Sequence, residues 1–218
     1  MDKLEFWTIC SANGIFIEKE QVEMFERLHD ELVYWNERIN LISRKDVENI
    51  WERHFLHSLA ILKYYEPPKK ARCIDIGTGG GFPGIPLKIA RQDLHMLLVD
   101  SIAKKIKMAG MFAQHTALRD ISARTARTEE LVKEPGFKKS FDVVFARAVA
   151  PLVELLDWTK DLRKPTAPLV TLKGGDLAEE IAAAKDVFKN MTVEEINISM
   201  RGAPWFEQEG KKLLICRF

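Results

Sequence analysis

The stretch from Cys73 to Pro86, CIDIGTGGGFPGIP, constrains the fold of this chain more than any other part of the sequence. A short apolar run ends there in a cluster of glycines, and apolar residues at helical spacing follow at Leu87, Ile89 and Ala90. This order predicts a strand, a tight glycine turn and then a helix. Because glycine can adopt positive φ and has no Cβ, such a turn can approach a ligand closely. The segment therefore predicts a turn that cradles a cofactor.

Two acids flank this turn. Asp75 enters it, and Asp100 ends the next apolar run, at the place where nucleoside-binding sheets have a carboxylate for the ribose hydroxyls. No Gly-Lys-Ser/Thr follows, as it would in a phosphate-binding loop. The pair favours a ligand that is a nucleoside at one end and cationic at the other, such as S-adenosylmethionine, over a pyrophosphate. The alternative is that Asp75 only caps the turn and Asp100 the next helix.

Length and composition predict one main domain with an appendage, because 218 residues that are 46% hydrophobic suffice for one well-buried core. No run is apolar over a membrane-spanning length and no signal-peptide pattern occurs, so we expect a cytoplasmic chain without a membrane partner.

Three scattered cysteines predict neither disulfides nor a metal site. Residues 1–66 hold 8 Lys and Arg against 13 Asp and Glu, a net −5, and the remainder holds 25 against 19, a net +6. A basic remainder is compatible with a phosphate-bearing substrate.

Apolar periodicity predicts the order of elements. Three helices are expected before Pro67-Pro68, so residues 1–66 are predicted to be a helical extension packed on a core formed by residues 67–218. Strands and helices then alternate, which predicts an α/β, Rossmann-like parallel sheet with helices on both faces and an antiparallel C-terminal hairpin, as in nucleoside-dependent methyltransferases. The expected helices are 4–12, 18–39, 46–62, 85–91, 103–116, 151–162 and 176–190, and the expected strands are 72–76, 95–99, 121–124, 141–146, 168–172, 192–199 and 211–217.

Ligands of such sheets bind beyond the carboxyl ends of the strands, so the residues after each strand are the candidate site. These positions are Asp75 and Gly77, Asp100, Arg124–Glu129, Arg147, and Lys173-Gly174.

The loop after the fourth strand limits the acceptor of a methyl group. Exocyclic amines usually require an Asn/Asp-Pro-Pro-aromatic loop, but this chain has Ala146-Arg147-Ala148, and no cysteine lies nearby to attack a pyrimidine carbon. A ring nitrogen with a free lone pair, such as guanine N7, requires neither, because it is unprotonated at neutral pH. Phosphates around the base would be bound by cations, and Arg147, Lys173 and Arg127 are the candidates. The alternative is that these three are ordinary surface charges. His54 and His57, three residues apart without further ligands, are predicted to be helix-surface residues from which substrate could be contacted rather than a metal pair.

With these residues identified, the chain resembles the RsmG family (GidB, glucose-inhibited division protein B), from about residue 22 to the C-terminus. The matching segments are Trp35–Leu41, Arg53–Leu59, Asp75–Pro86, Leu98–Lys105, Phe141–Ala148 and Leu172–Gly174. The family usually has Asp at the position of His57, Ala at Gly80 and Thr128, and Thr at Ile42 or Ser43.

The resemblance implies an enzyme that uses S-adenosyl-L-methionine to methylate guanine N7 in 16S ribosomal RNA, the family target being guanine 527 of the 530 loop. Its partner would be 16S RNA or the small ribosomal subunit, and the chain is expected to be a monomer without a metal. The predicted cofactor contacts are Asp75, Gly77, Gly79, Gly81, Phe82, Asp100, Ser101, Thr128, Glu129 and Arg147. The predicted catalytic or RNA-facing residues are Asn40, Arg127, Arg147 and Lys173.

Three other functions are compatible with the same strand-turn-helix unit. One is a NAD-dependent oxidoreductase, the second is a methyltransferase acting on another RNA, a small molecule or a protein, and the third is a non-catalytic module that senses the cofactor.

Overall fold

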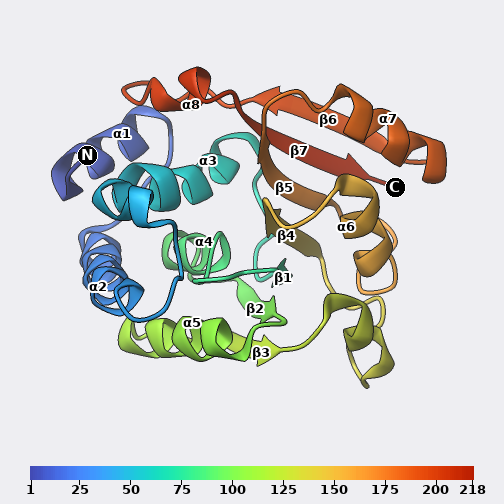
Figure 1. Cartoon of the computed structure of the whole chain (residues 1–218), viewed down its shortest axis with the longest axis horizontal. Coiled ribbons are helices and arrows are strands. Elements are labelled where there is room, and N and C mark those ends of the chain that lie inside the picture. The colour runs from blue at the N-terminus through green and yellow to red at the C-terminus, as the bar shows by residue number, and fades with distance from the viewer.

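The computed structural model describes residues 1–218, and a seven-stranded sheet runs through its centre (Figure 1). The strand order is β3-β2-β1-β4-β5-β7-β6; β1 to β5 are parallel, and β7 lies antiparallel between β5 and β6. The predicted α/β sheet with a C-terminal antiparallel hairpin is therefore confirmed. The strands are β1 (Arg72–Ile76), β2 (His95–Asp100), β3 (Ile121–Thr125), β4 (Val143–Arg147), β5 (Leu169–Gly174), β6 (Thr192–Asn197) and β7 (Lys211–Arg217).

Helices cover both faces of the sheet, and the alternation of strand side chains explains why. Cys73 and Phe145 lie in one buried cluster, whereas their neighbours Ile74 and Ala146 lie in the other. The first cluster packs against α4 (Gly84–Ala90), α5 (Ala103–His115) and the N-terminal extension, and the second against α6 (Leu152–Thr159), α7 (Ala178–Val187) and the 3-10 turn η3 (Thr128–Lys133).

The N-terminal extension shares the first of these cores with the sheet. Phe25 and Phe55 of the extension lie in the same buried cluster as Phe82 of the glycine loop. Gln21 donates from Nε2 to the carbonyls of Ile89 and Ala90 at 2.6 and 3.2 Å, which satisfies free acceptors at the end of α4. The extension contains α1 (Lys3–Ala12), α2 (Lys19–Asn36), η1 (Arg44–Asn49), η2 (Trp51–Leu56) and α3 (His57–Tyr64).

Two segments differ from their predicted form. The helix predicted over 46–62 is divided into a 3-10 turn, a π-helical turn and α3, and the loop predicted over 201–210 contains the short helix α8 (Trp205–Gln208). The aromatic rings of Trp205 and Phe206 lie 5.5 and 5.7 Å from the ring of His57, so tertiary packing of α8 on α3 accompanies both differences.

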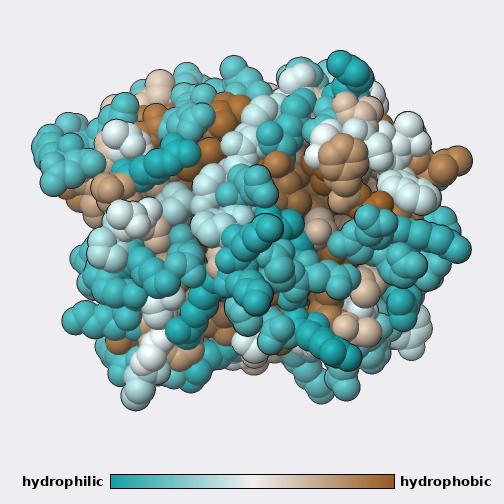
Figure 2. Space-filling model, turned by 180° about the vertical axis from the view of Figure 1, so that it is seen from behind, coloured by the Kyte–Doolittle hydropathy of each residue, from teal (hydrophilic) through white to brown (hydrophobic).

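The surface is mainly polar in the view of Figure 2, where hydrophilic residues cover most of the back of the molecule and apolar residues form separate patches. No helix combines the length and the apolar character that crossing a membrane would require.

Candidate active site

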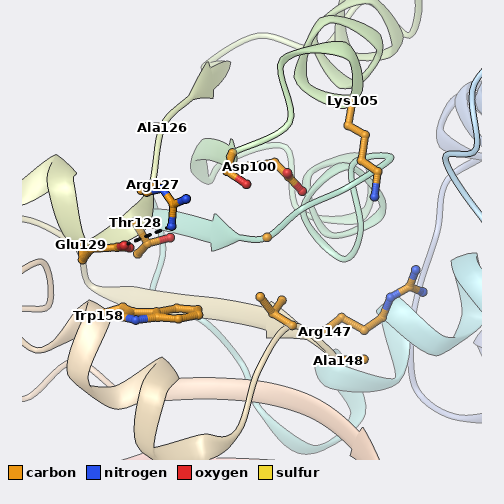
Figure 3. A pocket seen from close by; sticks show the side chains of 12 residues that line it. Asp100, Lys105, Ala126, Arg127, Thr128, Glu129, Arg147, Ala148 and Trp158 are labelled. Carbon is orange, nitrogen blue, oxygen red and sulfur yellow. Dashed lines mark ion pairs between the residues drawn. The ribbon is translucent and has the colours of Figure 1, made fainter.

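A cavity of about 320 Å³ opens beyond the carboxyl ends of the central parallel strands (Figure 3). The loops after β1, β2, β3 and β4 all contribute to its wall, as the doubly wound topology predicts. The residues that line it are Gly77, Asp100, Ser101, Lys105, Ala126, Arg127, Thr128, Glu129, Arg147, Ala148, Val149 and Trp158.

The glycine loop is shaped by two positions that only glycine fits. Gly77 has a φ of +62°, and a Cβ built on it would lie 2.5 Å from Cγ2 of Val149 across the cavity wall. Gly81 has a φ of +98°, and a Cβ there would collide with the side chain of Ile85 in α4. Of the predicted glycine contacts, Gly77 lines the cavity, whereas Gly79 and Gly81 belong to the same loop but do not line it.

Backbone N–H groups of this loop are used within the protein. Gly79 donates to Oδ2 of Asp100 at 2.9 Å, and Gly84 donates to Oδ2 of Asp75 at 2.8 Å. Thr78 donates to a β2 carbonyl, and Gly81 and Phe82 both donate to the carbonyl of Thr78. A phosphate-binding loop instead directs its N–H groups at the anion. The geometry therefore argues against a pyrophosphate in this cavity.

The two acids have different surroundings. Asp100 lines the cavity and accepts from Gly79 on Oδ2 and from Ile102 on Oδ1, each at 2.9 Å, which leaves further lone pairs for a ligand. Asp75 does not line the cavity; its Oδ2 also accepts from the Thr78 hydroxyl at 2.5 Å, and its buried Oδ1 has no partner. Burial raises the pKa of Asp75 to about 7, despite the hydrogen bonds that oppose the rise. Its contacts are those of a carboxylate that organises the turn.

Arg147 lines the cavity with its stem and directs its guanidinium toward the helical extension, as Figure 3 shows. Nη2 lies 2.9 Å from Nδ1 of His54, Nη1 donates to the carbonyl of Arg53 at 3.4 Å, and Cζ lies 4.8 Å from the centre of the Phe82 ring. Burial lowers the pKa of Arg147 to about 10, so the side chain remains a cation at neutral pH. No carboxylate lies within ion-pair distance, and three of its five N–H groups are not engaged with protein.

The prediction that His54 and His57 are helix-surface residues is wrong, because both are buried, with 6% and 8% of their surface exposed. Burial, together with the charges of Arg147 and Arg53, lowers the pKa of His54 to about 2. Burial also lowers the pKa of His57, which packs edge-on against Trp205. His54 in η2 lies against Phe82 of the glycine loop and His57 in α3 lies against Trp205 of α8, so both histidines face the interior.

The loop after β3 contributes three predicted residues to the wall. Arg127 is 71% exposed at its side chain and lies 4.0 Å from Glu129, the ion pair drawn in Figure 3, whereas Thr128 is buried between them. Ser101 also lines the cavity and is exposed.

Three further predicted residues lie outside the cavity wall. Phe82 is buried beneath the guanidinium of Arg147. Lys173 pairs with Glu180 of α7 and donates to the carbonyl of Ala150 at 2.7 Å. Asn40 is exposed beside Leu41, the residue that packs on the glycine loop.

Sequence reasoning missed four residues of the wall: Lys105, Ala148, Val149 and Trp158. Lys105 and Ala148 stand in segments that match the RsmG pattern, so those segments could have identified them. Trp158 lies in α6, and only its packing shows that it faces the cavity.

Comparison with known proteins identifies a methyltransferase family, in agreement with a cavity suited to a nucleoside cofactor. The family model GidB, described as rRNA small subunit methyltransferase G, matches residues 21–208. The chain belongs to this family. A ribosomal RNA small subunit methyltransferase G from Bacteroides thetaiotaomicron is 41% identical over 186 residues, covering 81% of this chain and 84% of the relative. The protein of the same name from Roseiflexus sp. (strain RS-1) is 37% identical over 197 residues, covering 90% and 83%.

Solved structures confirm the predicted methyltransferase fold. A SAM dependent methyltransferase from Aquifex aeolicus superposes with a TM-score of 0.57 at 13% identity, covering 81% of this chain and 98% of that one. A ribosomal protein L11 methylase from Lactobacillus delbrueckii subsp. bulgaricus gives a TM-score of 0.55 at 17% identity, covering 78% and 79%. The methyltransferase fold and the membership of the RsmG (GidB) family that were expected from the sequence are both established. The solved structures support the fold only.

Proposed function

We propose that this protein transfers a methyl group from S-adenosylmethionine to N7 of a guanine in 16S ribosomal RNA. The observation that carries the proposal is the glycine loop, in which the N–H groups of Thr78, Gly79, Gly81, Phe82 and Gly84 have acceptors within the protein while Asp100 faces the cavity. Such a site accepts a nucleoside with a cationic end and offers little to a pyrophosphate, which also disfavours a NAD-dependent oxidoreductase. Family membership supplies the ribosomal RNA substrate.

The residues present fit this cofactor. Gly77 lacks the Cβ that would meet Val149 and so leaves the wall open, and the unused lone pairs of Asp100 suit ribose hydroxyls. Ser101, Thr128 and Glu129, in the loops after β2 and β3, would contact the rest of the cofactor. When bound, S-adenosylmethionine supplies a methyl group on a positively charged sulfur.

The chain's own residues then have a positioning task. Guanine N7 carries a lone pair at neutral pH, so no residue has to remove a proton before methyl transfer. Alignment of donor and acceptor alone can supply several kcal/mol. We assign the free N–H groups of Arg147 to an oxygen of the RNA, with Arg127 at the opposite end of the cavity as a second, more exposed cation.

Two experiments test the proposal. Thermal shift should show stabilisation by S-adenosylhomocysteine and none by NAD, and Asp100→Ala should weaken the S-adenosylhomocysteine effect. Cleavage mapping of N7-methylguanosine should show one guanine of 16S RNA unmodified in cells that lack the protein. Stabilisation by NAD, or an unchanged pattern of modified guanines, would contradict the assignment. We also propose that the protein acts in the cytoplasm and as a monomer.

A further inference from the structure

Two segments beside the glycine loop contain cations and no acid. Residues 38–45, RINLISRK, include Arg38, Arg44 and Lys45, and residues 101–107, SIAKKIK, include three lysines. We call these two segments together the basic rim. The extension as a whole carries a net −5 over residues 1–66, so a basic stretch inside it is a local reversal of charge.

The two segments of the basic rim lie on either side of the glycine loop. On one side Leu41 packs on Gly80, since a Cβ built there would lie 3.4 Å from Cβ of Leu41. On the other side Asp100, directly before the second segment, accepts from the N–H of Gly79 at 2.9 Å. Figure 3 shows Lys105 extending from α5 at the edge of the cavity. The first segment of the rim therefore borders the glycine loop from the extension, and the second segment borders the cavity from α5.

The charges of the rim are largely uncompensated. Only Arg38 forms an ion pair, at 3.6 Å from Glu37. The acids that adjoin the rim are engaged elsewhere: Asp46 accepts from Arg53 at 2.6 Å, and Asp100 accepts from backbone N–H groups. Four exposed cations of the rim have no acid within 4.0 Å of their charged groups, namely Arg44, Lys45, Lys104 and Lys107.

We propose that the basic rim is the surface on which the RNA backbone lies, with phosphates on both sides of the base that enters the cavity. The inference rests on the proposed function and states, in addition, where the RNA contacts the protein. A polyanionic strand matches two acid-free segments on the two sides of a loop beside the cavity, because each nucleotide carries one phosphate and neutralising it releases a counterion. Asn40, an exposed polar residue, lies within the first segment of the rim.

The test compares two fourfold variants with the same change in charge. The rim variant replaces Arg44, Lys45, Lys104 and Lys107 by Gln, and leaves Lys105 intact because it lines the cavity. The control variant replaces Lys69, Arg119, Lys138 and Lys185 by Gln, four residues that are also exposed and unpaired. Three of these precede β1, β3 and β4, at the opposite edge of the sheet. Binding to unmodified 16S RNA transcript, and to small subunits from cells lacking the protein, is measured over a series of salt concentrations.

We expect the rim variant to bind the transcript at least tenfold more weakly at ~0.15 M salt than the wild type does. The slope of log affinity against log salt should fall by about 0.7 for each phosphate that the variant no longer neutralises. The affinity for S-adenosylhomocysteine and the melting temperature should not change, and the control variant should bind RNA as the wild type does.

Equally weakened RNA binding in both variants, or unchanged RNA binding in the rim variant, would overturn the inference. The proposed function would still hold in either case, provided that the wild type methylates the RNA. Loss of subunit binding with transcript binding intact would also overturn it, because a ribosomal protein would then be what the rim contacts. A wild type that methylates no guanine would remove the proposed function itself.

Discussion

Replacing His54 by Leu should uncouple Arg147 from the extension. In the folded protein Arg147 is the donor, so Nδ1 of His54 accepts and the imidazole proton is on Nε2. A pKa of about 2 keeps the ring neutral throughout the pH range of any assay, so this acceptor is always available. Because the contact is made through Arg147, we regard His54 as a positioning residue.

The expected size follows from the surroundings of the contact. A hydrogen bond from a charged donor contributes roughly 1.5–3 kcal/mol, and Leu would leave a buried guanidinium N–H without an acceptor. If that energy holds Arg147 in place for methyl transfer, the rate constant should fall about 10- to 100-fold, since each 1.4 kcal/mol corresponds to a factor of ten. In His54→Asn the amide oxygen can accept from Arg147, so the rate should stay within about fivefold of the wild type.

The assay is single-turnover transfer of a labelled methyl group into 16S RNA transcript, with the melting temperature and the affinity for S-adenosylhomocysteine measured on the same samples. Both His54→Leu and His54→Asn disturb a buried site and should lower the melting temperature. The rate should recover in His54→Asn alone, and any titration of the rate between pH 6 and 8 should be the same in the wild type and in His54→Asn, because Asp75 titrates in that range and His54 does not. Equal rates in the two variants, whether high or low, would refute a role for the acceptor.

Three other residues give predictions of different kinds. Gly77→Ala should weaken S-adenosylhomocysteine binding at least tenfold, because the new Cβ would lie 2.5 Å from Val149, and adding Val149→Ala should recover part of the affinity in a calorimetric titration. For Asp75, the pKa of about 7 in the folded state exceeds the ordinary 3.8, so its stabilising contribution is complete below pH 3.8 and is lost as the pH rises through 7. In urea denaturation, the unfolding free energy of the wild type relative to Asp75→Asn should therefore fall by roughly 4 kcal/mol between pH 4 and 8, and a constant difference would contradict the shift. Lys173→Met should destabilise the fold by roughly 3 kcal/mol by leaving Glu180 without its cation, with Glu180→Gln in the same chain recovering part of it. A loss of turnover without a loss of stability would instead favour the predicted direct role of Lys173.

The parts of the fold that were predicted from sequence depend on local periodicity. Apolar residues in β2 and β4 form short continuous runs because both faces of those strands are covered, and each predicted strand overlaps the observed one. The cavity followed from the same reasoning, because parallel strands present their carboxyl ends at one edge. Asp100 and Arg147 were placed correctly at that edge because they directly end β2 and β4.

The parts that sequence did not predict depend on contacts between distant segments. His54 and His57 stand three apart on a helix in either description, but only the packing of α8 and the glycine loop shows that they are interior residues. Lys173 directly follows the buried part of β5, yet its charge is satisfied by Glu180 from the next helix. Hydrophobic pattern gives the face of an element, whereas the partner of a buried polar group is set by tertiary structure.

The same tertiary contacts make the N-terminal extension a structural support of the active site. Asn36, at the end of α2, accepts through Oδ1 from the N–H groups of Leu41 and Ile42 at 2.8 and 3.0 Å, which fixes the turn that packs on Gly80. His54 holds Arg147 from the same extension. One contact supports the loop proposed to receive the cofactor, and the other supports the cation proposed to face the RNA. Since these contacts arise from a core continuous with the sheet, the extension supports the glycine loop and Arg147 without itself lining the cavity, and it is not a separate lid.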